Sequence, residues 1–361
     1  MDKKRGNILK ILVSSLVAVA LLYFSFKGVK WSDFLEALKS CDWGFVILSM
    51  FAGLISFYLR ALRWRELLLP FDPSLRKIPV FNAINISYVV NLALPRVGEI
   101  ARCGYVTAAS AKSEPDENGE THRLASFDKV LGTVALERSW DVVTMLLLLT
   151  TFLYFGWKRF GAFFMDNAIR PIMEKVGLDT LWPVFGAVAV IALSFWLIRK
   201  LSHKSREMGK VAAFFKGIWQ GISSCLKMKS AWKFFALTAG IWFAYWLMSY
   251  SILLAIQGIS PSAVSPGLAA SLGKLMSLDW TDALFLMLVG SIASVVPVPG
   301  GFGAFHYIVA LAISSVYGVP FEVGIIFATL SHESQTLIQI ICGGVSFASF
   351  SLAKKTTKEG D

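Results

Sequence analysis

Eight charged side chains stand within or beside long apolar stretches of the sequence, where an ionisable group is costly and is a functional candidate by default. They are Arg60, Arg63, Arg96, Glu99, Arg102, Glu137, Arg138 and Asp141. A spacing of three residues puts Arg96, Glu99 and Arg102 along one side of a helix. In the segment 137–141, Glu137 and Asp141 share a helix face, and Arg138 can pair with Asp141. Guanidinium groups bind phosphate through two parallel hydrogen bonds, so the arginines are candidates for holding an anionic head group. The carboxylates would then orient the arginines or relay protons, and the alternative is a purely structural ion-pair network.

A second set of polar residues lies in the last part of the chain, around a glycine-rich turn at residues 297–303. Backbone amides at Gly300 and Gly301 could bind an anion at a helix start, although glycine also serves close helix packing. The polar residues after the turn are His306, His332, Glu333, Gln335 and Gln339. Helical spacing aligns positions 332, 335 and 339 into one polar stripe on an apolar helix. We expect this stripe to line a cavity, the alternative for each histidine being a satisfied core residue.

The residues that surround these two sets are unusually apolar. The chain is 55% hydrophobic and 16% charged, against about 25% charged residues in soluble proteins. Apolar runs of spanning length occupy residues 11–26, 43–59, 130–156, 181–198, 232–256 and 324–350. About 20 helical residues cross a bilayer, and the in-out alternation of a membrane β-barrel is missing. The sequence therefore predicts an all-α polytopic membrane protein with about six full spans, forming a single membrane domain over residues 1–361. The first run follows a basic segment but lacks a small-residue cleavage site, so we expect a retained helix rather than a signal peptide.

Other functional classes find little support in the sequence. The four cysteines are far apart and form no CxxC pair, so they indicate neither a disulfide framework nor a zinc site. The common motifs of soluble hydrolases, metalloproteases and nucleotide-binding enzymes are missing. The net charge of +11 comes from Lys and Arg in predicted cytoplasmic loops, where membrane lipid is the expected partner and nucleic acid is not. No cofactor and no metal is expected, and a homodimer is left open.

The distribution of basic residues predicts how the chain lies in the membrane. Cytoplasmic loops carry an excess of Lys and Arg, and the longest hydrophilic segment, residues 199–233, holds nine of them. We therefore expect a cytoplasmic connecting region at 199–233, cytoplasmic N- and C-termini, and insertion in the plasma (inner) membrane. This orientation requires that two apolar stretches, residues 80–110 and 280–316, enter the membrane and return to the side from which they came.

Each of these two stretches is interrupted near its centre by proline and glycine, the first at residues 94–98 and the second at 297–303. Proline removes a helical hydrogen-bond donor and glycine weakens a helix, so each stretch should break into two short arms. The order of a span, a broken stretch and a span then recurs in residues 43–156 and 232–350. Two oppositely oriented re-entrant helical hairpins in an inverted repeat are typical of transporters with a site near the midplane. Two kinked full spans without symmetry are the alternative.

Four motifs, in this order, resemble the lysylphosphatidylglycerol synthase transmembrane-region family over nearly the whole chain. They are RALRW at 60–64, LPRVGEIAR at 94–102, ERSWD at 137–141 and PVPGGFGAF at 297–305. The resemblance implies a flippase-like membrane domain that moves aminoacylated phosphatidylglycerol, or handles polyprenyl or hopanoid lipids in other members. A separate soluble domain attaches the amino acid in that family, and these 361 residues contain none, so such synthesis is not expected of this chain. Many members have Glu at the position of His306 and Arg near that of His332, which leaves the head group open.

The function expected from these features is that of a lipid translocase rather than an enzyme. We expect the charged side chains named above to form a pocket in the cytoplasmic half of the membrane. The head group of an anionic or lipid-linked substrate, a phospholipid or a polyprenyl-linked lipid, would enter this pocket while its tails stay in the bilayer. Motion of the hairpins or of the inverted halves would then expose the site to the other leaflet. One alternative is an intramembrane transferase with Glu99 or Asp141 as general base, and another is a non-catalytic partner of a lipid-synthesising enzyme.

Overall fold

The computed structural model describes residues 15–115, 121–175, 216–221, 223–224, 228 and 230–358. Within these residues every regular element is helical, an isolated bridge between Lys112 and Arg123 is the one β pairing, and no strand forms. The all-helical fold predicted from the sequence is therefore confirmed. The expected span at 181–198 and most of the connecting region at 199–233 lie outside the described residues.

Four helices of the described part of the chain are long and apolar enough to cross a membrane. They are α3 (Trp43–Leu68), α6 (Phe127–Phe164, continued by the π-helical turn η1, Met165–Ile169), α10 (Ala231–Gln257) and Pro299–Tyr317, which ends with α13 (Ala304–Tyr317). The expected span at 324–350 falls in the 38-residue helix α14 (Phe321–Lys358), whose middle carries polar residues. The N-terminal apolar run is represented by the shorter helix Ser15–Phe26.

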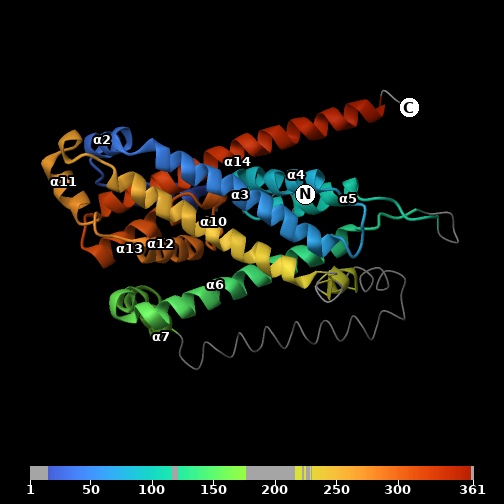
Figure 1. Cartoon of the computed structure of the whole chain (residues 1–361), viewed down its shortest axis with the longest axis horizontal. Coiled ribbons are helices and arrows are strands. Elements are labelled where there is room, and N and C mark those ends of the chain that lie inside the picture. Colours follow the sequence, from blue (N-terminus) through green and yellow to red (C-terminus); the bar gives the residue numbers. More distant parts are fainter. Residues whose placement is uncertain are drawn as a thin grey trace.

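Helices α3 and α10 lie side by side through the middle of the molecule and run antiparallel (Figure 1). The backbone N–H of Asp42, just before α3, donates to the Ala255 carbonyl near the end of α10 at 3.0 Å. Farther along, the Ser49 hydroxyl donates to the Met248 carbonyl at 3.2 Å. Both broken stretches pack against this central pair. Further short elements are α2 (Trp31–Ser40), α7 (Arg170–Lys175), η3 (Pro261–Ala263) and α11 (Pro266–Gly273).

The first broken stretch forms two short helices, α4 (Lys77–Ala93) and α5 (Val97–Ala109), that pack against each other. Between them, Leu94 is extended and Arg96 adopts a left-handed conformation with φ of 66°. Among the described residues, Arg96 is the one non-glycine residue with positive φ, a conformation that is costly for a residue with a Cβ. The interruption predicted at Pro95 is confirmed.

The second broken stretch forms α12 (Trp280–Ala293) and α13, with the short 3-10 turn η4 (Pro299–Gly301) between them. Gly300, Gly301 and Gly303 have φ between 58° and 79°, which glycine adopts without steric cost. The clustering of glycines that identified this turn in the sequence therefore has a backbone cause. The predicted interruption is confirmed here too.

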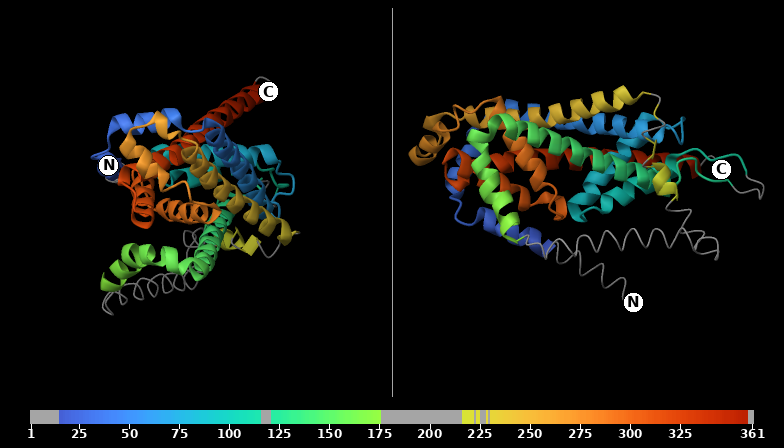
Figure 2. Two further views of the ribbon diagram at one scale, coloured as in Figure 1. Left: turned by 60° about the vertical axis from the view of Figure 1, so that its left-hand side comes forward. Right: turned by 90° about the horizontal axis from the view of Figure 1, so that it is seen from below.

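The two interruptions touch each other, although they are far apart in the chain. The guanidinium of Arg96 donates to the Val295 carbonyl, just after α12, at 3.2 Å. A Cβ at Gly300 would lie 3.1 Å from the side chain of Leu92, near the end of α4. The tips of the two pairs of short helices approach from opposite ends of the molecule (Figure 2). The breaks therefore form one junction rather than two separate irregularities.

The loop between α3 and α4 is tied to the end of α5 by one buried carboxylate. Asp72 accepts hydrogen bonds from the Ser110 hydroxyl at 2.7 Å, from the Ala111 amide at 2.8 Å and from the Ser74 amide at 3.0 Å. Burial by itself raises the pKa of Asp72, but these hydrogen bonds outweigh it and hold the pKa below its ordinary value. The carboxylate therefore stays ionised at neutral pH and fixes the end of α5 relative to α3.

Close packing of α4 and α5 depends on Gly98, because a Cβ at that position would lie 2.0 Å from the carbonyl oxygen of Ser87. We expect Gly98→Ala to push the two helices apart and to cost about 1–3 kcal/mol of stability. Gly104→Ala in the same helix is the matched control, because its Cβ would meet no atom within 4 Å and alanine favours a helix over glycine by about 1 kcal/mol. Thermal unfolding of the two detergent-solubilised variants measures the difference, and equal unfolding temperatures would contradict this packing.

Candidate functional site

Seven of the eight charged residues expected to form a site converge where α3, α5 and α6 meet. They are Arg60, Arg63, Glu99, Arg102, Glu137, Arg138 and Asp141, called the arginine network below. Helix α3 supplies two arginines about one turn apart, α5 supplies an ion pair at i and i+3, and α6 supplies the remaining three residues. Helical spacing on each element turns these side chains toward the same point.

Glu137 is the centre of the arginine network. Its side chain is 0% exposed, and its Oε1 accepts from Nη2 of Arg60 at 2.9 Å and from Nη2 of Arg63 at 3.3 Å. Its Oε2 accepts from Nη1 of Arg102 at 2.8 Å. One carboxylate is thus shared by three buried guanidinium groups from two other helices. A buried charge that loses its partner is strongly destabilising, so this shared contact locks the three helices together.

Two further carboxylates surround this centre. Asp141 contacts Nη2 of Arg63 at 2.6 Å and Nη2 of Arg60 at 3.0 Å. Glu99 contacts Nη2 of Arg102 at 2.6 Å, across one turn of α5. Each of the three buried arginines therefore has two carboxylate partners. The prediction that α6 directs two acidic groups to a single face agrees with these contacts.

Arg138 forms the open end of the network. It pairs with Glu99 at 2.8 Å and lies 3.7 Å from Asp141, as the spacing on α6 had indicated. Its side chain is 40% exposed, whereas that of Glu137 is fully buried. The network is thus closed at Glu137 and accessible at Arg138. Arg138 is therefore the arginine of the network that an anion can reach from outside.

The charges of the arginine network do not cancel. Four arginines face three carboxylates, which leaves one formal positive charge in excess. Within the described residues, buried Nε–H groups have no hydrogen-bond partner on Arg60, Arg63, Arg102 and Arg138. A buried donor of a charged group without an acceptor is costly, and phosphate oxygens are strong acceptors for guanidinium. The arrangement therefore favours the binding of an anion.

Arg96 is the exception among the eight. Its spacing predicted that it shares a helix face with Glu99 and Arg102, but α5 begins only at Val97. The left-handed backbone at Arg96 directs its exposed side chain to the Val295 carbonyl instead. The prediction that Arg96 aligns with the other two is wrong, because the helix on which that alignment depends does not include it. Arg96 joins the two breaks.

Residues of α10 support the network and were not identified from the sequence. The Tyr245 hydroxyl accepts from Nη1 of Arg60 at 2.8 Å, and the Thr238 hydroxyl accepts from Nη1 of Arg63 at 3.4 Å. A tyrosine and a threonine on an apolar helix give no signal of their own in the sequence. Their role follows from the antiparallel packing of α3 and α10, which brings residues far apart in the chain into contact.

An apolar groove of about 460 Å³ lies between α6 and α10. Its lining includes Trp140 and Leu147 of α6 and Trp246 of α10. At one end of the groove Trp140 meets Phe235 of α10, with their ring centroids 5.5 Å apart. Thr238 lines the groove and also accepts the hydrogen bond from Arg63, so the groove ends at the arginine network. The apolar groove therefore borders the positively charged network at the buried guanidinium of Arg63.

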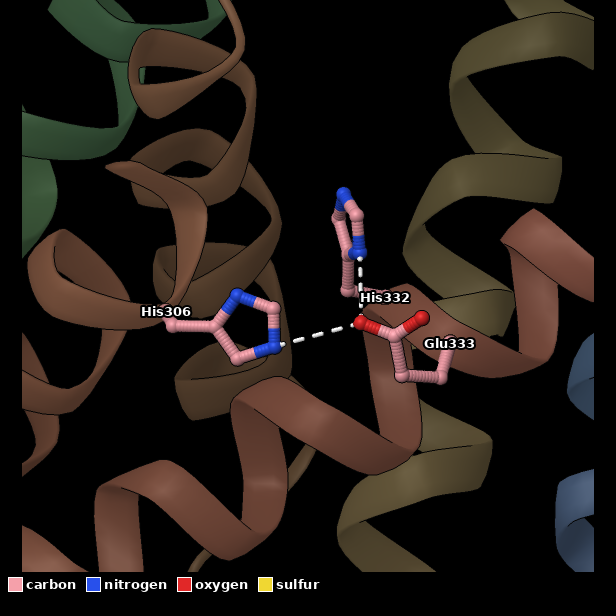
Figure 3. A group of neighbouring side chains, drawn as sticks. All are labelled: His306, His332 and Glu333. Carbon is pink, nitrogen blue, oxygen red and sulfur yellow. Dashed lines mark hydrogen bonds and ion pairs between the residues drawn. The ribbon is translucent and has the colours of Figure 1, made fainter. Parts of the chain in front are cut away.

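The second set of expected residues forms a separate group on α13 and α14, called the histidine cluster below. Oε1 of Glu333 lies 3.4 Å from Nε2 of His306 and 3.1 Å from Nδ1 of His332 (Figure 3). Nε2 of His332 lies 2.9 Å from the carbonyl oxygen of Gly300. The three side chains can each offer one ligand atom to a metal ion, and these atoms lie within 4.8 Å of one another.

Gly301 and Gln335, two other members of the second set, have partners in the fold. The amide of Gly301 donates to the Val298 carbonyl at 3.1 Å, so it is engaged within the turn. Nε2 of Gln335 donates to the Ser49 carbonyl at 3.1 Å and ties α14 to α3. The polar stripe expected on the last span is therefore divided, because His332 faces the second break while Gln335 faces α3.

The long apolar helices, the interrupted helices and the buried charges between them define an integral membrane protein. The family described as "Lysylphosphatidylglycerol synthase TM region" matches residues 7–343. The chain therefore belongs to this family, and the resemblance inferred from its four motifs is confirmed. No curated protein and no solved structure matches the chain.

We expect Glu137→Gln to destabilise the protein by about 3–5 kcal/mol, because it leaves the buried guanidinium groups around it without their shared counter-charge. Glu99→Gln is the matched control: it makes the same change at a partly exposed carboxylate and should cost about 1 kcal/mol or less. Equilibrium unfolding in mixed detergent micelles measures both free energies. A cost for Glu137→Gln no larger than that for Glu99→Gln would contradict the central place of Glu137.

Proposed function

We propose that this protein binds the phosphate of an anionic or lipid-linked lipid at the arginine network and moves it between the leaflets of the inner membrane. The family links its membrane domain to lipid modification or translocation. The observation that carries the proposal is the junction of the apolar groove with a site that has positive charge in excess. The tails of a phospholipid or of a polyprenyl-linked lipid would lie along the groove while the phosphate meets the arginines.

The N–H groups of two indole rings in the groove favour a ligand that carries polar atoms near its head. The Nε1–H groups of Trp140 and Trp242 are buried and have no acceptor within the described residues. Trp242 as a whole is 8% exposed, so solvent does not satisfy its N–H freely. Unpaired buried donors cost stability, which a phosphate or ester oxygen in the groove would recover. The groove thus suits an amphipathic ligand better than a purely apolar one.

The contact between the two breaks suggests where the protein could move, namely between the pair α4 and α5 and the pair α12 and α13. We propose that α4 with α5 and α12 with α13 are re-entrant hairpins that enter from opposite sides, with both termini cytoplasmic. The halves 43–156 and 232–350 would then be an inverted repeat, related across the antiparallel pair α3 and α10. Within the described residues, the hydrogen bond from Arg96 to the Val295 carbonyl crosses the junction, and α4 also packs against η4 there. A relative shift of the hairpins would break this bond and slide α4 along η4. Such a shift would open the site to the opposite leaflet.

The transferase alternative has less support. It requires Glu99 or Asp141 as general base, and both carboxylates are already paired with arginines, at 2.6–3.0 Å for their closest contacts. A base must be free to accept a proton from its substrate. A new lipid species in extracts of cells that contain the protein would favour the transferase, whereas a translocase changes only the leaflet in which a lipid is found. Co-purification with a lipid-synthesising enzyme would favour the role of a non-catalytic partner.

A flip assay in sealed vesicles tests the proposal, with the purified protein and a fluorescent lipid whose outer-leaflet fraction is read by quenching. The wild-type protein should move anionic phosphatidylglycerol faster than zwitterionic phosphatidylcholine. Arg138→Gln removes the excess charge and one phosphate ligand at the accessible end. The lost hydrogen bond to a charged group, about 1.5–3 kcal/mol, predicts a rate at least about tenfold lower. A fluorescent polyprenyl phosphate in the same assay distinguishes the two lipid classes.

Arg170→Gln is the control for this variant, since Arg170 is an exposed arginine paired with Asp166 away from the network. It should transport lipid as the wild type does. Ala239→Trp, which fills the groove without touching a charge, should slow transport of both classes of lipid. The proposal fails if vesicles with the wild-type protein move none of the three lipids faster than protein-free vesicles, or if Arg138→Gln transports as fast as Arg170→Gln.

A further inference from the structure

Both ring nitrogens of His332 face oxygen atoms. Nε2 lies 2.9 Å from the Gly300 carbonyl oxygen, and Nδ1 lies 3.1 Å from Oε1 of Glu333. The Thr336 hydroxyl lies 3.5 Å from Nδ1 and donates its proton to the His332 carbonyl at 3.0 Å, so it too presents a lone pair to Nδ1. A neutral imidazole carries only one N–H. In a neutral His332, one ring nitrogen therefore directs its lone pair at an oxygen lone pair, unless a cation stands between them.

We propose that this cation is a divalent transition metal, best matched by Zn²⁺, and that its ligands are Nε2 of His306, Nδ1 of His332 and Oε1 of Glu333. Two imidazoles and one carboxylate are a ligand set that zinc takes in proteins, with a fourth position left for water or another oxygen. The site lies in the histidine cluster, on helices that contribute nothing to the arginine network. It goes beyond the proposed lipid translocation and does not depend on it.

The separations between the three side chains fit a metal better than direct hydrogen bonds. A charge-assisted hydrogen bond between nitrogen and a carboxylate is about 2.7–2.9 Å long. The two separations from Oε1 of Glu333 are longer, 3.1 Å to His332 and 3.4 Å to His306. Ligand bonds of about 2.0–2.1 Å in a tetrahedral zinc site place neighbouring ligand atoms about 3.3 Å apart. The third separation is bounded by 4.8 Å, so a small rotation of one ring completes the site.

The surroundings have the features of a metal site beyond its direct ligands. The hydrogen bond from Nε2–H of His332 to Gly300 leaves the lone pair on Nδ1, which is how an outer partner fixes the ligating tautomer. His306 is 1% exposed and is held among aromatic rings, with the ring centroid of Phe26 at 5.7 Å. The Glu333 side chain is 42% exposed, so one side of the site is open to an incoming ion and to a fourth ligand.

A metal ion at this point would connect three segments of the chain. His306 belongs to α13, and His332 and Glu333 belong to α14. Through the bond to Gly300, the ion would also hold the turn between α12 and α13. It would therefore fix the second broken stretch against the last helix. Loss of the ion should loosen this part of the protein without disturbing the arginine network.

The test measures zinc binding to the purified full chain, carrying an affinity tag without histidine, in detergent after treatment with a chelator. The wild type should bind one Zn²⁺ per chain, and Co²⁺ in its place should show the visible absorption of a tetrahedral site. His306→Ala and Glu333→Gln should each weaken the affinity for zinc at least about tenfold. Zinc should raise the unfolding temperature of the wild type, because it binds the folded state, and should not raise that of Glu333→Gln.

His122→Ala is the matched control, because it removes a histidine that lies in the loop before α6 and outside the cluster, and it should bind zinc as the wild type does. Glu333→Gln preserves the shape of the side chain, and gel filtration shows whether it is folded. If Glu333→Gln does not fold, the zinc stoichiometry and the Co²⁺ spectrum of the wild type test the proposal by themselves. Substoichiometric zinc in the wild type, or unchanged affinity in both ligand variants, overturns the proposal. A protein that binds no zinc but gains stability as the pH falls would hold an imidazolium instead, which also overturns it.

Discussion

The carboxylate of Glu137, shared by Arg60, Arg63 and Arg102, is the contact on which the rest of the structure depends. The four groups come from α3, α5 and α6 and lie in an apolar interior, where none can withdraw without leaving a charge uncompensated. The contact therefore fixes α5, and with it the first break, against the long helices. The excess charge, the accessible arginine and the end of the groove are all placed by this one arrangement.

A second constraint comes from the close approach of helices in lipid, where packing rather than the hydrophobic effect drives association. Glycines at helix contacts leave no room for a Cβ: one at Gly53 would meet the side chain of Gln335, and one at Gly324 would meet Ala310. These contacts bring α14 against α3 and α13. Gln335 of α14, which is 9% exposed, is thereby buried in protein rather than exposed to lipid, which is the condition under which a membrane helix tolerates it.

The sequence predicted the features that depend on one helix or one turn. Proline and glycine identified both breaks, and helical spacing placed Glu137 and Asp141 on one face of α6. Features that depend on packing between distant segments could not be predicted. The hydrogen bonds of Tyr245 and Thr238 to the network depend on the packing of α10 beside α3. The groove also depends on the position of α10. Arg96 was misplaced because spacing assumes a continuous helix, and a single left-handed residue redirected it.

The histidine cluster likewise depends on packing between segments that are separate in the chain. His332 and Glu333 are neighbours in the chain, but His306 joins them only because α13 packs on α14. The cysteines, which are the usual sequence signal for a metal, lie elsewhere and predicted none. Spacing along the chain also cannot decide the number of spans, since Pro299–Tyr317 is long and apolar enough to cross and yet begins with a turn.

In the proposed function, the arginine network holds the phosphate of a lipid. The most direct measurement is a cryo-electron microscopy map of the protein in a lipid nanodisc that contains phosphatidylglycerol. We expect density for one lipid whose phosphate lies about 3 Å from a guanidinium of the arginine network and whose tail follows the groove between α6 and α10. A map in which lipid phosphates lie only at the membrane surface, with the arginines satisfied by protein groups alone, would contradict it.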